Sequence, residues 1–162
     1  MLVRTVTADD QPWIRAFLDE RWGGQEQVAN GETFRPADLP GYLAEIDGEI
    51  VGYAAVREGA DGAEIAVIEA LRPQEGIGSA LVAASIEYAR SIGSPVLRAI
   101  TTNDNWVAQA FYVALGFRPV ETRPGAVTES RKIKPQIPLE GADGTPITDE
   151  LEYELTLEPA SG

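Results

Sequence analysis

The hydrophobic period of the chain changes abruptly on either side of Gly76. Residues 63–71, with the sequence AEIAVIEAL, are mostly apolar, which favours a buried strand. From Ile77 onward the apolar residues recur at helical spacing, at Ile77, Ala80, Leu81, Ala84 and Tyr88. A strand that passes through a Gly-bearing turn directly into a helix therefore predicts a helix packed against a sheet.

The rest of the chain extends this pattern of strands and helices. Further strands are expected at 2–7, 42–46, 50–57, 96–101, 117–122 and 151–157, and further helices after Asp10 and over 108–115. An Asp47-Gly48 turn joins two of these strands in a hairpin. Segments 21–40 and 124–149 contain Gly and Pro and are expected to be irregular, with a helix near 127–133. This order predicts a mixed sheet with helices on its faces.

Two absences limit the chemistry that is open to the chain. It contains no cysteine and no histidine. Disulfides, thiolate or imidazole metal sites, a Cys nucleophile and a Ser-His pair are therefore excluded, and no metal site is expected. An acid or a base must be an Asp, Glu, Tyr or Lys side chain or a chain terminus.

The charge of the chain excludes another class of partner. The formal net charge is −13, so we expect no nucleic-acid partner. An acidic surface favours cationic small molecules or peptides, although it also serves simply to keep a protein soluble. No apolar run approaches the roughly 18 residues of a membrane span, and residues 1–10 do not form a secretory signal. We therefore expect a cytoplasmic protein without a membrane partner.

The turn between the predicted strand and helix has the sequence PQEGIGSAL over residues 73–81. The first turn of a helix leaves backbone N–H groups unpaired, and glycines at 76 and 78 would let a phosphate approach them closely. A Walker loop is excluded because no Gly-Lys-Ser/Thr follows, and the dinucleotide pattern fails at Leu81. Taken alone, a Gly-x-Gly turn is equally consistent with close packing of the helix on the sheet.

A second motif lies about 30 residues after this turn. Residues 105–117, NWVAQAFYVALGF, closely resemble the Asn-x-x-Ala-x-x-Phe-Tyr-x-x-x-Gly-Phe segment of the GNAT superfamily of acyl-CoA N-acyltransferases. The resemblance extends over residues 3–117, and the tail resembles a bacterial subgroup of unknown substrates. It implies an α/β (α+β) fold with a mixed, mostly antiparallel sheet of six to seven strands and three to four flanking helices. It also implies one domain over 1–162, with 124–149 an irregular insertion before the last strand.

The resemblance implies roles for particular residues. The coenzyme A pyrophosphate would be held by the loop residues Gln74, Glu75, Gly76, Ile77, Gly78 and Ser79. Ala70 and Leu71 would pair with the pantetheine arm through their backbone, and Asn105 would lie beside that arm. Tyr112 would face the acyl sulfur as the proton donor. One position departs from the family, which usually has Arg or Gln where this chain has Pro73, a residue without an N–H. Coenzyme affinity is then expected to depend on whether Arg72 or Gln74 substitutes.

Two further candidates come from the residues themselves. Glu69 interrupts an apolar strand, so it is either a general base acting through water or a solvated edge residue. Trp22, beside Gly23-Gly24, is a candidate wall of the acceptor pocket, whereas Trp13 fits a core position. Segments 22–39 and 124–149 are expected to form that pocket.

These observations predict an N-acetyltransferase that moves an acetyl group from acetyl-CoA to a primary amine of a small molecule or peptide by direct attack. A non-catalytic acyl-CoA-binding or sensory module on the same fold stays open. So does a structural domain in which the glycines serve only packing. A homodimer formed through the tail also stays open.

Overall fold

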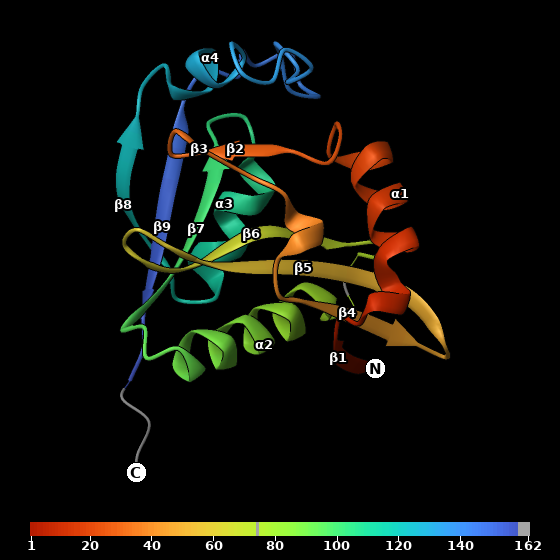
Figure 1. The fold of residues 1–162 in the computed structure, drawn as a ribbon. Helices are drawn as coiled ribbons and strands as arrows, with labels where there is room; N and C mark the ends of the chain where they lie inside the picture. Colours follow the sequence, from red (N-terminus) through yellow and green to blue (C-terminus); the bar gives the residue numbers. More distant parts are fainter. Residues whose placement is uncertain (74, 159–162) are drawn as a thin grey trace.

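A seven-stranded sheet with helices on both faces forms the body of the molecule (Figure 1). The computed structural model describes residues 1–73 and 75–158. In spatial order the strands are β1 (Leu2–Thr5), β4 (Gly41–Ile46), β5 (Glu49–Gly59), β6 (Gly62–Ala70), β7 (Val96–Thr102), β9 (Glu150–Thr156) and β8 (Arg118–Arg123). Every neighbouring pair is antiparallel except β6 and β7. The predicted mixed, mostly antiparallel sheet is confirmed.

The helices divide between the two faces of the sheet. The side chains of Tyr53 and Ala55 on β5 pack with α1 (Gln11–Arg21). Ala54, which lies between them, packs on the opposite face with α2 (Ile77–Ser91). On that same face α3 (Trp106–Ala114) places Tyr112 in a core cluster with residues of α2 and β7. A short helix, α4 (Ala126–Ser130), lies beyond the end of the sheet near β8 and β9 (Figure 1). Each helix of the described ranges is too short or too polar to cross a bilayer.

The buried face of α2 differs from the predicted one. Ile77 and Leu81 are buried as expected, but the other fully buried positions are Val82, Ser85 and Ala89. Ala80, Ala84 and Tyr88 are only half-buried, at the margin of the contact. The helix crosses from β4 and β5 toward β7, so its buried stripe turns away from the predicted line as it proceeds.

The segment predicted to be irregular before β4 contains regular structure. It forms a small hairpin of β2 (Gln27–Ala29) and β3 (Glu32–Phe34), followed by a 3₁₀ turn over Pro36–Asp38. Three-residue strands are too short to show an alternating pattern. The available signal was the turn itself: Asn30 and Gly31 both have positive φ, 50° and 72°, as the tight hairpin turns that favour Asn-Gly require. Figure 1 shows this hairpin near the upper ends of β7 and β9, and its turn residue Asn30 donates to Glu150 of β9.

Candidate active site

The parallel strands β6 and β7 pair over only part of their length. Residues 63–65 of β6 face residues 97–99 of β7, after which the two strands separate. Residues 67–70 of β6 therefore pair with β5 alone. Because the Leu71 N–H donates to Val51 of β5 at 2.8 Å, the alternation of an antiparallel ladder directs the backbone groups of Ile68 and Ala70 toward the open side. The gap thus presents free strand-edge hydrogen-bonding groups.

The beginning of α2 lies at the end of this gap. Gly76 precedes the helix with φ 72°, a left-handed conformation that favours glycine. The Ala80 N–H donates to the Gly76 carbonyl at 3.1 Å. No hydrogen bond from the N–H groups of Ile77, Gly78 and Ser79 is seen within the described residues. Three donors at the positive end of the helix dipole form a site suited to an anion.

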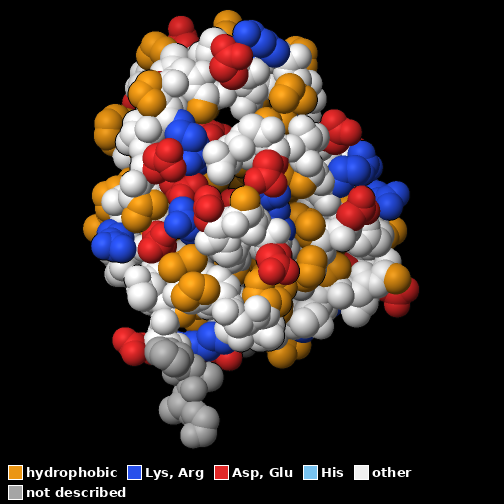
Figure 2. Space-filling view, turned by 60° about the vertical axis from the view of Figure 1, so that its left-hand side comes forward, with side chains coloured by type: hydrophobic (Ala, Val, Ile, Leu, Met, Phe, Trp, Pro, Cys, Tyr) orange, Lys and Arg blue, Asp and Glu red, His pale blue; other side chains and the backbone are white. Residues whose placement is uncertain are grey.

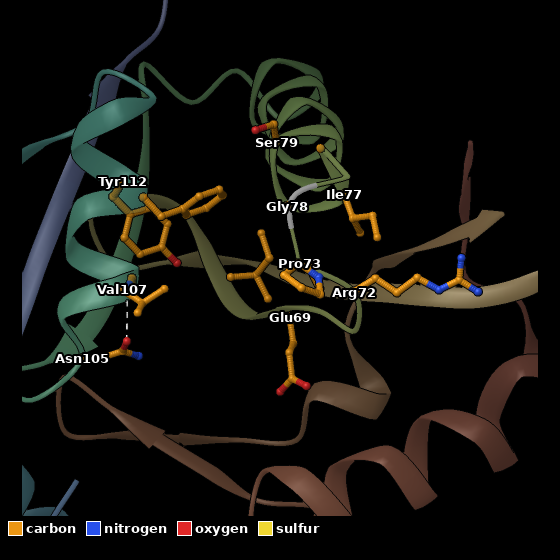
Figure 3. A pocket seen from close by; sticks show the side chains of 14 residues that line it. Glu69, Arg72, Pro73, Ile77, Gly78, Ser79, Asn105, Val107 and Tyr112 are labelled. Carbon is orange, nitrogen blue, oxygen red and sulfur yellow. Dashed lines mark hydrogen bonds between the residues drawn. The ribbon is translucent and has the colours of Figure 1, made fainter. Parts of the chain in front are cut away.

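A cavity of about 650 Å³ joins the strand gap to the helix terminus (Figure 3). We call it the main cavity. Its walls are formed by Ile68, Glu69, Ala70, Arg72, Pro73, Gly76, Ile77, Gly78, Ser79, Asn105, Val107, Ala108, Phe111 and Tyr112. Most of the predicted cofactor and catalytic residues therefore share one cavity. Leu71 and Glu75 are not among its walls, and Gln74 lies outside the described residues.

Gly78 lies where α2 packs closely against α3. A Cβ at this position would lie 3.1 Å from two ring carbons of Phe111. The main cavity is also lined by Val107, Ala108 and Phe111. The sequence motif contains these three residues but did not indicate that they contact a ligand. Because Gly78 has no side chain, a ligand can approach the start of α2, and α2 and α3 can pack closely together.

Tyr112 combines a buried ring with an accessible hydroxyl. Its ring packs against Phe117 and Tyr153, with centroid separations of 5.2 and 5.9 Å. Figure 3 shows the hydroxyl directed into the main cavity, and no hydrogen-bond partner for it is found in the described part of the chain. Burial raises the pKa of the Tyr112 phenol, so the group stays protonated at neutral pH. A protonated phenol can donate a hydrogen bond but cannot act as a base.

Asn105 is fixed by the helix that it begins. Its side-chain Oδ1 accepts a hydrogen bond from the Ala108 N–H at 3.1 Å, the usual geometry of a helix N-cap. The amide NH₂ is left over for a ligand, and the residue lines the main cavity as well as a second cavity described below.

Glu69 and Trp22, which the sequence suggested separately, are joined to one another. One carboxylate oxygen of Glu69 accepts from the Arg21 guanidinium, and the other accepts from Trp22 Nε1 at 3.2 Å. Each carboxylate oxygen has a second lone pair, so Glu69 can still accept a hydrogen bond from a water in the cavity.

Arg72 and Pro73 line the main cavity between β6 and α2. The Arg72 guanidinium forms an ion pair with Glu49 at 2.5 Å and lies 3.9 Å from Glu75. A half-exposed guanidinium at this position can turn toward an anion at the helix terminus, whereas Pro73 offers no donor.

The second cavity, of about 220 Å³, lies beneath the β2–β3 hairpin, and we call it the hairpin pocket. It is lined by Trp22, Gln27, Val28, Ala29, Phe34, Ala66, Ile100, Thr101, Thr102, Asn105, Val127, Ser130, Ile137 and Glu150. Segments 22–39, with Trp22, and 124–149, which were both predicted to line a pocket, contribute to it. The sequence analysis did not predict the strand residues of its wall, which are Ala66, Ile100, Thr101, Thr102 and Glu150. Across residues 1–73 and 75–158 no group of acidic side chains is arranged to hold a metal ion.

Comparison with known proteins agrees with this geometry. The model of the acetyltransferase (GNAT) family matches residues 7–117. The uncharacterised protein YxbD of Bacillus subtilis is 34% identical over 139 residues, which cover 85% of this chain and 87% of the relative. YdhI of the same organism is 32% identical over 143 residues, 88% of this chain and 89% of the relative.

Solved structures share the fold at lower identity. A GNAT family acetyltransferase from Elizabethkingia anophelis with acetyl-CoA bound superposes with a TM-score of 0.71 at 19% identity, covering 96% of this chain and 97% of that one. YncA from Salmonella typhimurium, solved with its cofactor acetyl-CoA, gives 0.70 at 18% identity over 100% and 96% of the two chains. The family match spans more than half of the sequence, and the chain belongs to the GNAT family of acetyltransferases.

Proposed function

We propose that this protein is an N-acetyltransferase that transfers the acetyl group of acetyl-CoA to a primary amine of a small molecule or peptide. The observation that carries the proposal is the content of the main cavity. Amides at the start of α2 that have no partner among the described residues, the edge of β6 that faces away from β5, and the Tyr112 hydroxyl all face the same space. We further propose that residues 1–162 act as one domain in the cytoplasm.

The residues of the main cavity fit acetyl-CoA, which would supply the acetyl thioester. The N–H groups of Ile77, Gly78 and Ser79 would hold the pyrophosphate, with Arg72 as the nearby cation in place of the polar side chain that Pro73 lacks. The backbone of Ile68 and Ala70 would pair with the amide groups of the pantetheine arm, as a strand edge pairs with a neighbouring strand.

Tyr112 would donate a hydrogen bond to the departing sulfur. A thiol has an ordinary pKa of about 8.5 and a tyrosine of about 10, so complete proton transfer costs roughly 2 kcal/mol before burial is considered. Burial raises the pKa of Tyr112 further, which favours partial over complete transfer. We therefore assign Tyr112 a contribution of about 10²-fold to turnover.

Glu69 would accept the proton of the attacking amine through a water molecule. Glu69 is a wall residue of the main cavity, and Arg21 and Trp22 hold its carboxylate in a fixed orientation. The rest of the acceleration would come from positioning, since the amine attacks directly and no covalent intermediate forms on the protein.

The first experiment is a calorimetric titration of the protein with acetyl-CoA, with acetate as the control. Saturable binding of acetyl-CoA and not of acetate is expected. Release of coenzyme A thiol with a panel of amines then measures transfer.

Tyr112→Phe tests the mechanism. It should lower kcat by about 10²-fold and leave the affinity for acetyl-CoA unchanged. Tyr153→Phe is the matched control, because it removes the same atom from a neighbouring ring of the same core cluster that does not line the main cavity. Equal turnover of both variants would remove Tyr112 from the mechanism.

A non-catalytic acyl-CoA-binding module is the second candidate, and Pro73 favours it. A proline in this position removes a donor that would otherwise face the anion site. Saturable binding of acetyl-CoA without thiol release from any amine would select this alternative.

A further inference from the structure

The hairpin pocket has apolar walls and a single charged side chain. Trp22, Val28, Phe34, Ile100 and Ile137 supply most of its hydrocarbon surface. Among the described residues that line it, Glu150 alone carries a charge. Its volume of about 220 Å³ lies below the usual 300–1,000 Å³ of sites for drug-sized ligands, so it suits one small apolar group.

Glu150 is fixed in place from two sides. It is 4% exposed, and its carboxylate accepts hydrogen bonds from the Asn30 N–H at 3.2 Å and from Arg123 Nε at 3.0 Å. Asn30 lies in the turn of the β2–β3 hairpin, so the same carboxylate ties that hairpin to the sheet. Glu150 lines the hairpin pocket, and these hydrogen bonds hold its carboxylate in one orientation beside it.

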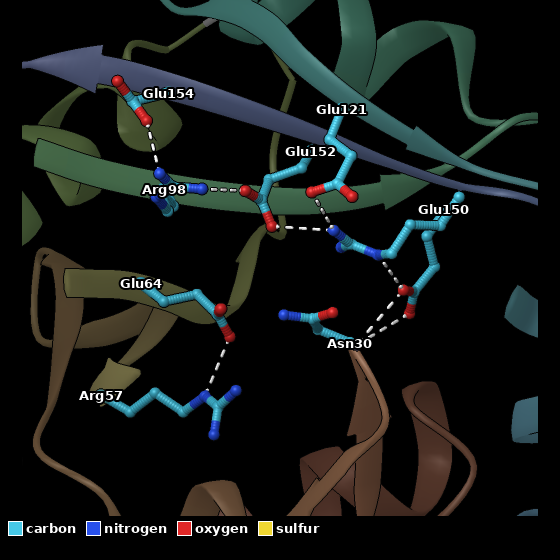
Figure 4. A network of polar contacts seen from close by, with 9 residues as sticks. Asn30, Arg57, Glu64, Arg98, Glu121, Glu150, Glu152 and Glu154 are labelled. Atoms are coloured by element: carbon cyan, nitrogen blue, oxygen red, sulfur yellow. Dashed lines mark hydrogen bonds and ion pairs between the residues drawn. The ribbon is translucent and has the colours of Figure 1, made fainter. Parts of the chain in front are cut away.

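The surroundings of Glu150 are negative on balance (Figure 4). The ion pairs of this region join four arginines, Arg57, Arg98, Arg118 and Arg123, to six glutamates, Glu32, Glu64, Glu121, Glu150, Glu152 and Glu154. Arg123 alone faces three of these carboxylates. Figure 2 shows acidic and basic side chains intermingled around a hollow on one face of the molecule. The Lys134 ammonium, which donates to Trp22 and Gln27 of the pocket wall, adds one more positive charge. The six carboxylates still outnumber these five cations, so the positive charge of the region does not compensate for a further anion.

The hairpin pocket meets the main cavity at Asn105, which lines both. A ligand in the hairpin pocket can therefore direct an amine toward the space where Tyr112 places its hydroxyl. This step rests on the proposed function, which locates the acetyl group in the main cavity.

We propose that the acceptor is a small primary amine with an apolar body and no carboxylate group, and that Glu150 excludes free amino acids from the hairpin pocket. An ammonium group is attracted toward this region, and its apolar body is buried among the walls. A carboxylate on the same small body would lie in an apolar pocket beside a fixed like charge, which is strongly unfavourable.

Three ligands that share one phenylethylamine body test the proposal on the unaltered protein, and the amide and the acid among them are matched in size. These are 2-phenylethylamine, L-phenylalaninamide and L-phenylalanine, of which only the last carries a carboxylate. Their binding is measured by calorimetry in the presence of coenzyme A. Phenylalanine should bind at least about 30-fold more weakly than both of the others. Binding of phenylalanine equal to that of its amide would overturn the proposal. Tighter binding would also overturn it and would assign a carboxylate site to Arg123, whose Nη2 has no hydrogen-bond partner among the described residues.

A pair of variants tests the role of Glu150. Glu150→Gln keeps an oxygen for the Asn30 N–H and should reduce the discrimination to about threefold or less. Glu121→Gln is the matched control, since it removes the same charge from the same arginine on an exposed side chain outside the pocket. It should leave the discrimination unchanged. An equal effect of both variants would show that Glu150 has no special role.

Thiol release from acetyl-CoA with the same three ligands separates this proposal from the proposed function. Absence of release with these three ligands and with the wider panel of amines, while binding keeps the expected order, would refute the transferase and leave the pocket assignment standing. Release that is fastest with phenylalanine would refute the pocket assignment and leave the transferase standing.

Discussion

Gly78→Asp should weaken binding of acetyl-CoA by placing a carboxylate at the anion site. Gly78 belongs to the first turn of α2, where its N–H and those of Ile77 and Ser79 have no hydrogen-bond partner within the described chain. A side chain here would start 3.1 Å from the Phe111 ring. The substitution therefore has a steric part and an electrostatic part, which different variants separate.

The electrostatic part can be estimated from the position of the site. A carboxylate on residue 78 would lie about 6 Å from a pyrophosphate held by the same turn, and two unit charges at that distance repel by ~3 kcal/mol at an effective dielectric constant of about 20. Gly76 and Ser79 are exposed, so water and salt screen the interaction. We expect about 1.5–2.5 kcal/mol, or roughly 10- to 70-fold in Kd.

Gly78→Asn is the matched control because asparagine has the size of aspartate and no charge. Calorimetric titration with acetyl-CoA should give Gly78→Asn a Kd close to that of the unaltered protein, apart from the shift that Phe111 must make. The difference between the two variants should shrink between about 0.1 M and 1 M salt, as the screening length falls from ~10 to ~3 Å. Equal affinities of the two variants at low salt would refute a phosphate site at this turn.

Three other changes test the scaffold around the site. The Arg4 guanidinium beside Asp10 holds the pKa of that carboxyl well below its usual range, so Asp10→Asn should lower the free energy of unfolding by about 1–3 kcal/mol at pH 7. In urea titrations this difference should narrow as the pH falls below about 4, where the unfolded carboxyl becomes protonated first and the advantage of the ionised native carboxylate is lost. Gly52→Ala would place a methyl group 2.6 Å from Ile77, and it should lower the free energy of unfolding by about 1–3 kcal/mol, with roughly 2–4 °C of melting temperature lost per kcal/mol in a chain of this length. It should also shift the start of α2 and so weaken acetyl-CoA binding. Burial lowers the pKa of Lys134, whose ammonium donates to the Trp22 carbonyl and to the Gln27 side chain. Because both partners line the hairpin pocket, Lys134→Ala should raise the acceptor KM several-fold and leave the Kd for acetyl-CoA unchanged.

Local sequence patterns predicted the parts of the site that belong to single elements. The Gly-x-Gly turn and the Asn105 cap each depend on residues within one turn of helix, so their geometry follows from short-range rules. Tyr112 was found because its motif fixes its place on α3, although only the fold shows that its ring is buried and its hydroxyl is not.

Such local patterns could not predict the hairpin pocket, because its walls come from segments that are far apart in the chain. Glu150 contacts Asn30 across 120 residues, and Arg123 joins it across 27. Glutamates that alternate along a strand at 150, 152 and 154 read as an exposed edge, yet all three are buried here because arginines from neighbouring strands pair with them.

The difference between local and long-range contacts explains why the sequence alone did not identify the acceptor. The proposed donor site uses backbone groups at a helix terminus and a strand edge, and any sequence that builds those elements supplies them. The proposed acceptor site depends on which side chains lie beneath the β2–β3 hairpin, and long-range pairs such as Glu150 with Arg123 determine that arrangement. Changes at these pairs should therefore alter which amine binds and leave acetyl-CoA affinity intact, whereas changes at Gly78 should do the reverse.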